Sequence, residues 1–312
     1  VVAVINAAGE LTETIYNDAG HVSQVNAYAT RLTAVQLTLL NTTDANGFAA
    51  NLTIDQVRPL LDATNDRITR TFYDKAGRVV LVIVPTDSTA NQGYVTQQFY
   101  DGAGRVTDIV QYATPITLTT LPTNALADDV IVTTSTSDRH RRTFYTNDGL
   151  VQGTLDGEGF LSENSYDAAG RLTKQTAYAL ATSSTLRASG DFISLKASIT
   201  SNLLYNRTQD KTATTFYNAK GQVIGQLNSE GYLTTTAYTV NGHVEDIAQY
   251  DTPIMYTNQT LAQLLTASGA ARARSVNTYD AQQRLVLVTN FITGTQTESG
   301  YDSVGRLSRT TA

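Results

Sequence analysis

The stretch Tyr73-Asp74-Lys75-Ala76-Gly77-Arg78-Val79 recurs along the chain and decides the fold. It returns nearly unchanged at residues 100–106, 166–172 and 301–307. More degenerate copies bring the total to nine in 312 residues; they begin at Tyr16, Tyr145, Tyr217, Tyr238 and Tyr279. Glycine holds the fifth position in eight of the nine copies, and Gln283 holds it in the other. Repetition at this density predicts a repeat protein in which each copy is one structural unit.

The residues around each copy have the character of β-strands. Thr69–Tyr73 and Arg78–Val82 flank the second copy, and both are rich in β-branched or aromatic residues. Between them, Asp74 can accept hydrogen bonds from turn amides, and Gly77 can adopt a positive φ. This chemistry predicts a type I turn followed by a left-handed residue, the G1-bulge hairpin. Each copy is therefore expected to be an antiparallel hairpin whose first strand ends in Tyr.

A second set of glycine and tyrosine residues keeps a fixed distance from the first. Glycine lies seven residues before five of the tyrosines, at Gly9, Gly93, Gly159, Gly231 and Gly294. Tyrosine lies twelve residues after four of them, at Tyr28, Tyr112, Tyr178 and Tyr250, so 13 of the 17 tyrosines are in register. The glycines predict return turns between successive hairpins, and the array predicts a continuous antiparallel meander.

A longer period lies above these spacings, because Asp66, Asp138 and Asp210 are 72 residues apart. We expect one array over residues 1–312, with super-repeats at about 1–66 (partial), 67–138, 139–210, 211–275 and 276–312 (partial). Insertions separate pairs of hairpins at about 29–66, 113–138, 179–210 and 251–275. Capping boxes at Thr33…Gln36, Thr53…Gln56 and Thr260…Gln263 predict short amphipathic helices packed on one face of the sheet.

The composition restricts the class of function. The chain has 22 Lys and Arg against 28 Asp and Glu, a net charge of −6, which argues against binding dominated by nucleic-acid phosphates. There is no cysteine, so no disulfide, thiolate nucleophile or zinc–thiolate site can form. No apolar run approaches the roughly 20 residues of a membrane-spanning helix.

The repeated Tyr-Asp-x-x-Gly-Arg-Leu/Val motif resembles the RHS/YD repeat, over nearly the whole chain. That family implies a strip of antiparallel sheet that spirals into a hollow shell. It occurs in bacterial polymorphic toxins, in the B and C components of insecticidal toxin complexes and in animal teneurins. In the bacterial toxins the shell encloses a C-terminal toxic domain. The residues that carry the resemblance, all with structural roles, are Tyr16, Gly20, Tyr73, Asp74, Gly77, Arg78, Tyr100, Asp101, Gly104, Arg105, Tyr145, Gly149, Tyr166, Asp167, Gly170, Arg171, Tyr217, Gly221, Tyr238, Gly242, Tyr279, Asp280, Tyr301, Asp302, Gly305 and Arg306.

Two features depart from the family pattern. The insertions, which produce the period near 72, are longer than those of the simplest family arrays. The toxin shells also carry an Asp-Pro-containing self-cleaving segment, whereas the five prolines here follow Arg58, Val84, Thr114, Leu121 and Thr252. Self-processing is therefore not assigned to this sequence.

No catalytic, metal or cofactor site is expected. His21 and His243 stand where Arg usually follows the turn glycine, which favours a structural role, and His140 is expected to lie at a solvated strand start. The recurrent Asp residues are explained by turn chemistry, and the tyrosines in register are explained by cross-strand packing better than by stacking on sugars. We therefore expect a protein that is not an enzyme.

The functional expectation is a structural wall segment of an RHS-repeat β-shell that encapsulates or presents a toxin domain. The expected partners are further repeats of the same chain and the enclosed C-terminal toxin domain, with glycans as further candidates, and neither nucleic acid nor a membrane span. The last copy ends in mid-pattern at residues 301–307, so we expect an internal piece of a large bacterial protein that is secreted or at the cell surface. The alternative is an adhesive or carbohydrate-binding repeat, for which Tyr94 and Tyr232, outside the register, are the test residues.

Overall fold

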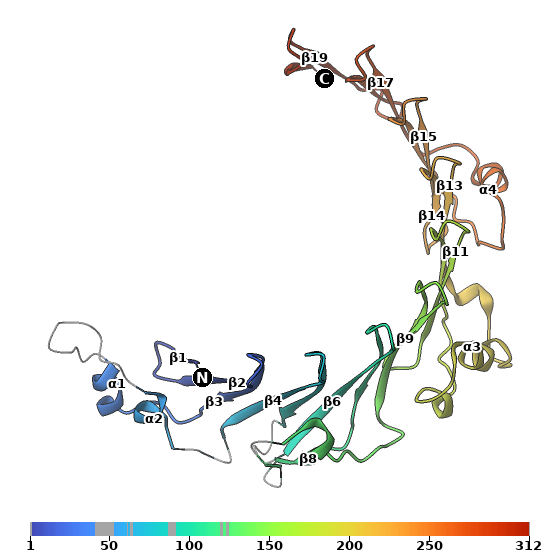
Figure 1. Ribbon diagram of the computed structural model, residues 1–312. Coiled ribbons are helices and arrows are strands. Elements are labelled where there is room, and N and C mark those ends of the chain that lie inside the picture. Colours follow the sequence, from blue (N-terminus) through green and yellow to red (C-terminus); the bar gives the residue numbers. More distant parts are fainter. Residues whose placement is uncertain are drawn as a thin grey trace. The chain divides into compact units, whose positions relative to one another are not determined.

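The chain forms an antiparallel sheet of 20 strands with a few short helices (Figure 1). The computed structural model describes residues 2–40, 53–60, 62, 65–86, 92–118, 121–122 and 125–311. The sheet is open, since among the described residues β1 (Val2–Ile5) pairs with β2 alone and β20 (Leu307–Thr311) pairs with β19 alone. The expected mainly-β hairpin array is therefore confirmed. The chain divides into two compact units, Val1–Thr143 with Leu155–Glu158 and Phe144–Thr154 with Gly159–Ala312.

All nine expected hairpins are present, and two strands are additional. The earlier strands are β2 (Leu11–Tyr16), β3 (Val22–Ala27), β4 (Arg67–Tyr73), β5 (Val79–Pro85), β6 (Gln92–Tyr100), β7 (Val106–Gln111), β8 (Ile116–Thr117) and β9 (Arg139–Tyr145). The later strands are β10 (Val151–Leu155), β11 (Leu161–Tyr166), β12 (Leu172–Ala177), β13 (Lys211–Tyr217), β14 (Val223–Leu227), β15 (Leu233–Tyr238), β16 (Val244–Gln249), β17 (Ala273–Tyr279), β18 (Leu285–Asn290) and β19 (Gln296–Tyr301). The nine hairpins account for 18 of the 20 strands, and β1 and β8 are the other two.

The hairpin turns have the geometry that their residues predict. In the second copy, the Gly77 amide donates to the Asp74 carbonyl over 3.0 Å, and Gly77 has φ +78°. The pairing register shifts between Phe72 and Tyr73, which is the expected bulge. One Asp74 carboxylate oxygen accepts from the amides of Ala76 and Arg78, each over 2.9 Å. The Asp side chain therefore stabilises the turn from within.

Gln283 takes the left-handed position of one turn without being glycine. Its φ is +64°, and its amide donates to the Asp280 carbonyl over 2.9 Å as a glycine amide does elsewhere. A side chain with a Cβ is strained in this region, so the remaining contacts of the hairpin must hold the turn.

The return turns are present at four of the five expected glycines. Gly9, Gly159, Gly231 and Gly294 all have positive φ and lie between strands. The expectation was wrong for Gly93, which lies inside β6 and pairs with Pro85 of β5 and Ile116 of β8. Its buried side faces Ile83 and Leu118, where a Cβ would lie 2.6 Å from an Ile83 methyl. This glycine therefore serves close packing and not a turn.

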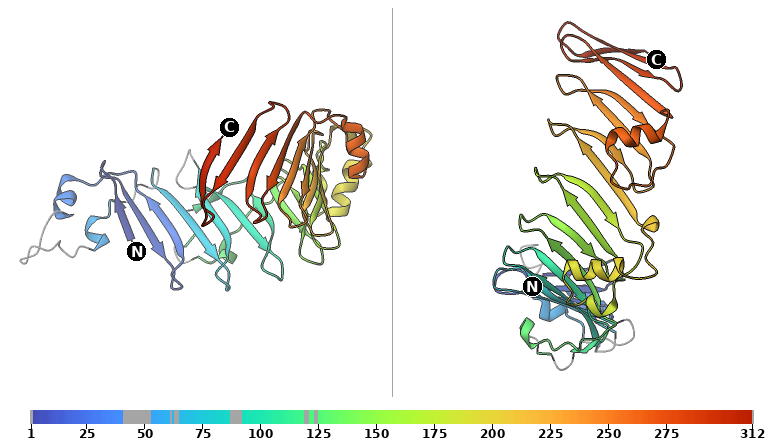
Figure 2. Two further views of the ribbon diagram at one scale, coloured as in Figure 1. Left: turned by 90° about the horizontal axis from the view of Figure 1, so that it is seen from above. Right: turned by 90° about the vertical axis from the view of Figure 1, so that its right-hand side faces the viewer.

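The helices lie in the insertions. They are α1 (Ala34–Leu40), α2 (Ile54–Val57), α3 (Phe192–Thr200) and α4 (Leu261–Ser268), with short 3₁₀ turns at Ala127–Asp129, Ser184–Leu186 and Arg207–Gln209. In the second unit, α3 and α4 cover the same face of the sheet (Figure 1 and Figure 2). We call it the insertion face.

The capping boxes at Thr33 and Thr260 are confirmed, but the helices differ in how many residues they bury. Thr260 accepts from the Gln263 amide over 3.3 Å, while the Gln263 side chain accepts from the Thr260 amide over 2.9 Å. The same exchange occurs at Thr33 and Gln36 at the start of α1. However, α1 buries none of its residues, whereas α3 buries Phe192, Leu195 and Ile199. The N-cap of helix α3 is Asp191, whose side chain accepts from the Ser194 amide. No capping box predicted this helix from the sequence.

Candidate functional site

The motif tyrosines form a ladder that joins each hairpin to the one before it. Seven of the motif tyrosine hydroxyls donate to the backbone carbonyl at the seventh position of the preceding copy, over 2.7 to 3.0 Å. The pairs are Tyr73–Val22, Tyr100–Val79, Tyr166–Val151, Tyr217–Leu172, Tyr238–Val223, Tyr279–Val244 and Tyr301–Leu285. A partly buried phenol is stabilised by such a partner, and the repeat supplies it in these seven pairs.

The motif arginines stack on the tyrosines of the same ladder. Arg78 lies 4.4 Å from the Tyr100 ring centroid, and Arg171 and Arg284 make the same contact with the next tyrosine at 4.5 and 4.6 Å. Each of these guanidinium groups also contacts the Asp of its own turn, as in Arg78–Asp74 at 2.6 Å. A cation over an aromatic face is attractive, so Asp, Arg and the next Tyr stabilise one another.

Two histidines replace arginine in this stack. His21 lies 4.7 Å from the Tyr73 ring and His243 lies 5.0 Å from the Tyr279 ring, measured between centroids. Both residues therefore have structural positions, as their place in the motif indicates.

The expectation for His140 was wrong. Its Nδ1 lies 2.9 Å from a carboxylate oxygen of Asp108, and the side chains are only 14% and 15% exposed. Burial raises the pKa of Asp108, and the charge and hydrogen bond of His140 oppose that rise. The residue is not a solvated strand start, because β7 pairs with β9 and brings Asp108 beneath it.

The second set of spacings holds the insertions to the sheet. The return-turn glycine carbonyl accepts from the residue four positions after the second tyrosine, in Leu32 to Gly9, Thr182 to Gly159 and Ile254 to Gly231, over 2.8 to 2.9 Å. The second tyrosine itself donates its amide to the first residue of the hairpin, as Tyr178 does to Leu161 over 3.0 Å. These glycines and tyrosines therefore recur because every insertion leaves the sheet in the same way.

The 72-residue period of Asp has the same cause. One carboxylate oxygen of Asp66, Asp138 and Asp210 accepts from the amides of Ala29, Ala113 and Ala179, over 2.8, 2.9 and 3.0 Å respectively. Each Asp directly precedes the strand that follows an insertion, and each Ala directly follows the second tyrosine. The side chain thus joins the two ends of the insertion.

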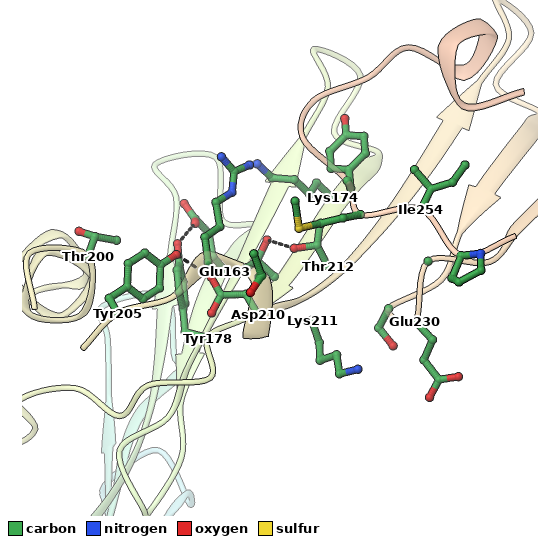
Figure 3. A pocket seen from close by; sticks show the side chains of 18 of the residues that line it. Glu163, Lys174, Tyr178, Thr200, Tyr205, Asp210, Lys211, Thr212, Glu230 and Ile254 are labelled. Atoms are coloured by element: carbon green, nitrogen blue, oxygen red, sulfur yellow. Dashed lines mark hydrogen bonds between the residues drawn. The ribbon is translucent and has the colours of Figure 1, made fainter. Parts of the chain in front are cut away.

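An acid, a tyrosine and a cation form the centre of two of these attachments. Glu163 accepts from the Tyr178 hydroxyl over 2.6 Å and from Lys196 of α3 over 2.7 Å (Figure 3). In the first unit, Glu13 accepts from the Tyr28 hydroxyl over 2.6 Å and from Arg58 over 2.6 and 3.1 Å. Both acids lie three residues before a motif tyrosine.

Their pKa values follow from these contacts. Burial raises the pKa of Glu163, but the hydrogen bonds from Lys196 and Tyr178 outweigh it, so the pKa lies below its usual range. The bonds from Arg58 lower the pKa of Glu13 in the same way. Burial and the neighbouring carboxylate raise the pKa of Tyr28 to about 12. Both acids are therefore ionised and satisfied at neutral pH, the opposite of a carboxyl group prepared to donate a proton.

The described residues contain no group of three or more His, Asp or Glu side chains placed to hold a metal ion. Among the helices that the structure describes, none has the length and apolar character needed to cross a membrane. The signature residues from Tyr16 to Arg306 all lie at hairpin turns or strand ends. The attachment residues Glu13, Arg58, Glu163 and Lys196 were not identified from the sequence; the position three residues before each tyrosine could have indicated the two acids.

These features define a β-hairpin repeat protein with inserted segments. No protein-family model matches the sequence, and no curated protein matches it. Among solved structures, TcdB2-TccC3-TEV is similar, with 15% identity and a TM-score of 0.39 over 98% of this chain and 14% of that one. TcdB2-TccC3 without the hypervariable C-terminal region has 17% identity and a TM-score of 0.38 over 98% and 14%. The Photorhabdus luminescens Tc holotoxin pore has 13% identity and a TM-score of 0.22 over 98% and 17%. This chain thus spans about one seventh of the first two chains. These similarities therefore do not determine its function, which must be inferred from the contacts of its own residues.

Proposed function

We propose that this chain is a structural wall segment of an RHS-repeat β-shell that encloses or presents a toxin domain, in a large exported bacterial protein. The observation that supports a structural role is the use of the repeated residues. The Asp, Arg and Tyr of the motif are taken up by contacts within and between hairpins. Side chains engaged in these contacts stabilise the sheet, and no repeated group of the motif remains for catalysis.

The number of strands in the sheet supports the same proposal. In an open sheet of 20 strands, a strand edge is covered only where a neighbouring strand pairs with it. Sheets of this width coil because their strands twist. The motif resembles that of a family whose sheets form hollow shells. On this proposal the chain is not an enzyme, its partners are further repeats and the enclosed domain, and its location is outside the cell or at the cell surface.

Electron microscopy of the natural full-length protein tests the proposal. We expect a closed or partly closed shell with density inside it, and the hairpins of this segment in its wall. A compact particle without an internal cavity would contradict the proposal.

Adhesion to glycans is the second candidate, and the exposure of two tyrosines favours it. Tyr94 and Tyr232 are 50% and 40% exposed, whereas Tyr28, Tyr112 and Tyr178 are at most 7% exposed. A glycan array with the natural chain and with Tyr94→Ala and Tyr232→Ala tests this candidate. Binding that both substitutions abolish would support adhesion through these rings; no binding, or binding that neither changes, would count against it.

A further inference from the structure

We propose that His140 and Asp108 form a proton-dependent salt bridge between the two strands that flank the insertion at residues 113–138. The inference goes beyond a wall function and does not depend on it. Strand β7 ends and strand β9 begins at this insertion, and the two strands pair directly. His140 lies opposite Val110 in that pairing, and its Nδ1 lies 2.9 Å from the Asp108 carboxylate, two residues earlier on β7.

A second insertion of the array has the same contact with a permanent cation. Strands β16 and β17 flank that insertion, and Arg274 contacts Asp246 there. Arg274 is the second residue of β17, as His140 is the second residue of β9. Asp246 is the third residue of β16, as Asp108 is the third residue of β7. The array therefore contains one diagonal contact twice, once with a guanidinium group and once with an imidazole, whose charge depends on pH.

The two cations satisfy their carboxylates to different extents. Arg274 donates to both oxygens of Asp246, over 2.6 to 3.2 Å. His140 contacts only Oδ2 of Asp108, and the buried Oδ1 has no hydrogen-bond partner among the described residues. The side chains of His140 and Asp108 are 14% and 15% exposed, against 50% and 22% for Arg274 and Asp246. Because an incompletely paired buried carboxylate is costly, a proton that gives His140 a positive charge stabilises the contact.

Proton uptake by the carboxyl group acts in the same direction. Burial raises the pKa of Asp108 more than its surroundings lower it. The opposing groups are His140, Arg142 and the Ile109 amide. The stabilising contribution of a carboxyl group with a raised pKa is fully present below the pKa of the unfolded state and is lost as pH rises through the folded value. A proton on either member of the pair therefore stabilises the contact between β7 and β9.

Among the side chains around Asp108, an imidazole is the kind that ordinarily changes its charge between about pH 5 and 8. Arg142 lies opposite Asp108 on β9 and supplies a positive charge that does not change in this range. The other neighbours on β7, on β6 and at the insertion are Ile109, Gln97, Phe99, Tyr112 and Asp138. His140 is therefore the neighbour through which pH acts on this contact near neutrality.

Mild acidification should consequently strengthen one attachment and leave its equivalent unchanged. The contact between β16 and β17 keeps its guanidinium charge throughout this range. The attachment of α3 is also unaffected, because the pKa of Glu163 lies below its usual range and that carboxylate is lost only at lower pH. The response is therefore local to the strands that flank residues 113–138.

Hydrogen exchange of the 312-residue chain at about pH 8 and about pH 5.5, corrected for intrinsic rates, tests the proposal. We expect the amides of residues 139–142 to be protected about tenfold more at the lower pH, since hydrogen bonds between charged groups are the stronger ones. Residues 273–276, which surround Arg274, are the internal reference and should show no such change.

Substitutions assign the response to the pair. His140→Gln should abolish it, and His140→Arg, which copies the permanent cation of β17, should keep residues 139–142 protected at both pH values. Asp108→Asn should also abolish the response and keeps the test decisive if arginine disturbs folding. His21→Gln and His243→Gln, which replace histidines at hairpin turns, are the matched controls and should leave the response unchanged.

Four results would overturn the proposal. The first is protection of residues 139–142 that is equal or lower at the lower pH. The second and third are a response that persists in His140→Gln or in Asp108→Asn, since another group would then cause it. The fourth is an equal response at residues 273–276, which would indicate a change in the stability of the whole sheet.

Discussion

Two insertions leave the sheet at equivalent points but are held there by different means. Residues 179–210 form α3, whose Phe192 packs against Gly153 and whose Lys196 pairs with Glu163. Residues 113–138 form no α-helix in their described part. There, Leu81 occupies the position of Gly153, Gln97 occupies that of Glu163, and Leu121 and Val130 join the apolar cluster around Leu81.

The difference shows how one sheet accepts two kinds of insertion. A glycine eight residues after the motif tyrosine makes room for a helix anchor, and Gly225 does the same for Leu261 of α4. A leucine at that position fills the space itself. The acid three residues before the tyrosine is matched by a cation, whereas Gln97 needs only the Tyr112 hydroxyl, which donates over 2.7 Å. In these two insertions charge and room differ together, whereas the α4 insertion combines Gly225 with Thr235 at the position of the acid.

Gly153→Ala should have the largest effect on this arrangement. A Cβ at Gly153 would lie 2.2 Å from the Ser162 carbonyl oxygen and 2.4 Å from the Phe192 ring. Because a backbone atom cannot easily yield, we expect a loss of about 3 kcal/mol or more in the free energy of unfolding, and detachment of α3. Urea unfolding and hydrogen exchange of residues 192–200 measure it. Gly102→Ala is the control, since a Cβ there meets nothing within 4 Å; equal effects in the two variants would refute the close approach of α3.

Leu81→Ala weakens the attachment of residues 113–138, which depends on a filled apolar cluster and not on the space beside a glycine. Leu81 is 2% exposed in the cluster with Val95, Leu121 and Val130, so truncation leaves a cavity and should cost about 3 kcal/mol. Thermal unfolding should show the loss, and hydrogen exchange should place it at residues 125–138. If exchange accelerated equally over 192–200, the two insertions would not be attached independently.

Glu163→Leu tests the charged attachment and should cost about 2 kcal/mol, because Lys196 and the Tyr178 hydroxyl lose a charged partner. Gln97→Leu removes a neutral acceptor from Tyr112 and should cost about 1 kcal/mol. The comparison of melting temperatures for the two variants gives the order. A larger loss at Gln97 would show that the charge pair adds nothing to the attachment of α3.

The hairpin turns are common to both regions, and substitutions in them should change the free energy of unfolding less than the substitutions above. Gly170→Val should cost about 1–2 kcal/mol through its φ of +75°, since a Cβ there meets only a Leu150 methyl at 3.7 Å. Gln283→Gly should add about 1 kcal/mol for the same reason in reverse. Denaturation midpoints check both. A stabilising valine or a destabilising glycine would refute the assigned turn.

The smallest expected effect is the pH dependence of the two attachments. The folded-state pKa of Glu163 is lowered, so its contribution is present above the pKa of the unfolded carboxyl and is lost as pH falls through the folded value. Gln97 does not titrate. Hydrogen exchange of residues 192–200, corrected for intrinsic rates, should therefore accelerate on acidification more than that of residues 125–138. Glu163→Gln should remove the difference, and its persistence in that variant would assign it to another group.

Much of the fold could be predicted from the sequence, because hairpin turns depend on residues close together in the chain. Asp74, Gly77 and Tyr73 specify a turn and its bulge locally, and nine copies make the pattern unmistakable. Gly93 was misassigned because a glycine that serves close packing has the same sequence signal as one that serves a turn. His140 was misassigned because its partner Asp108 is 32 residues away.

The sequence by itself therefore determined the hairpins, their number, the spacing of the insertions and the structural use of the tyrosines. Only the tertiary structure decided which acid meets which cation, and that Gly153 and Gly225 receive helix anchors. The physical reason is distance along the chain. Turn chemistry acts within about five residues, whereas Lys196 reaches Glu163 across 33 residues and Arg58 reaches Glu13 across 45, which no local pattern records.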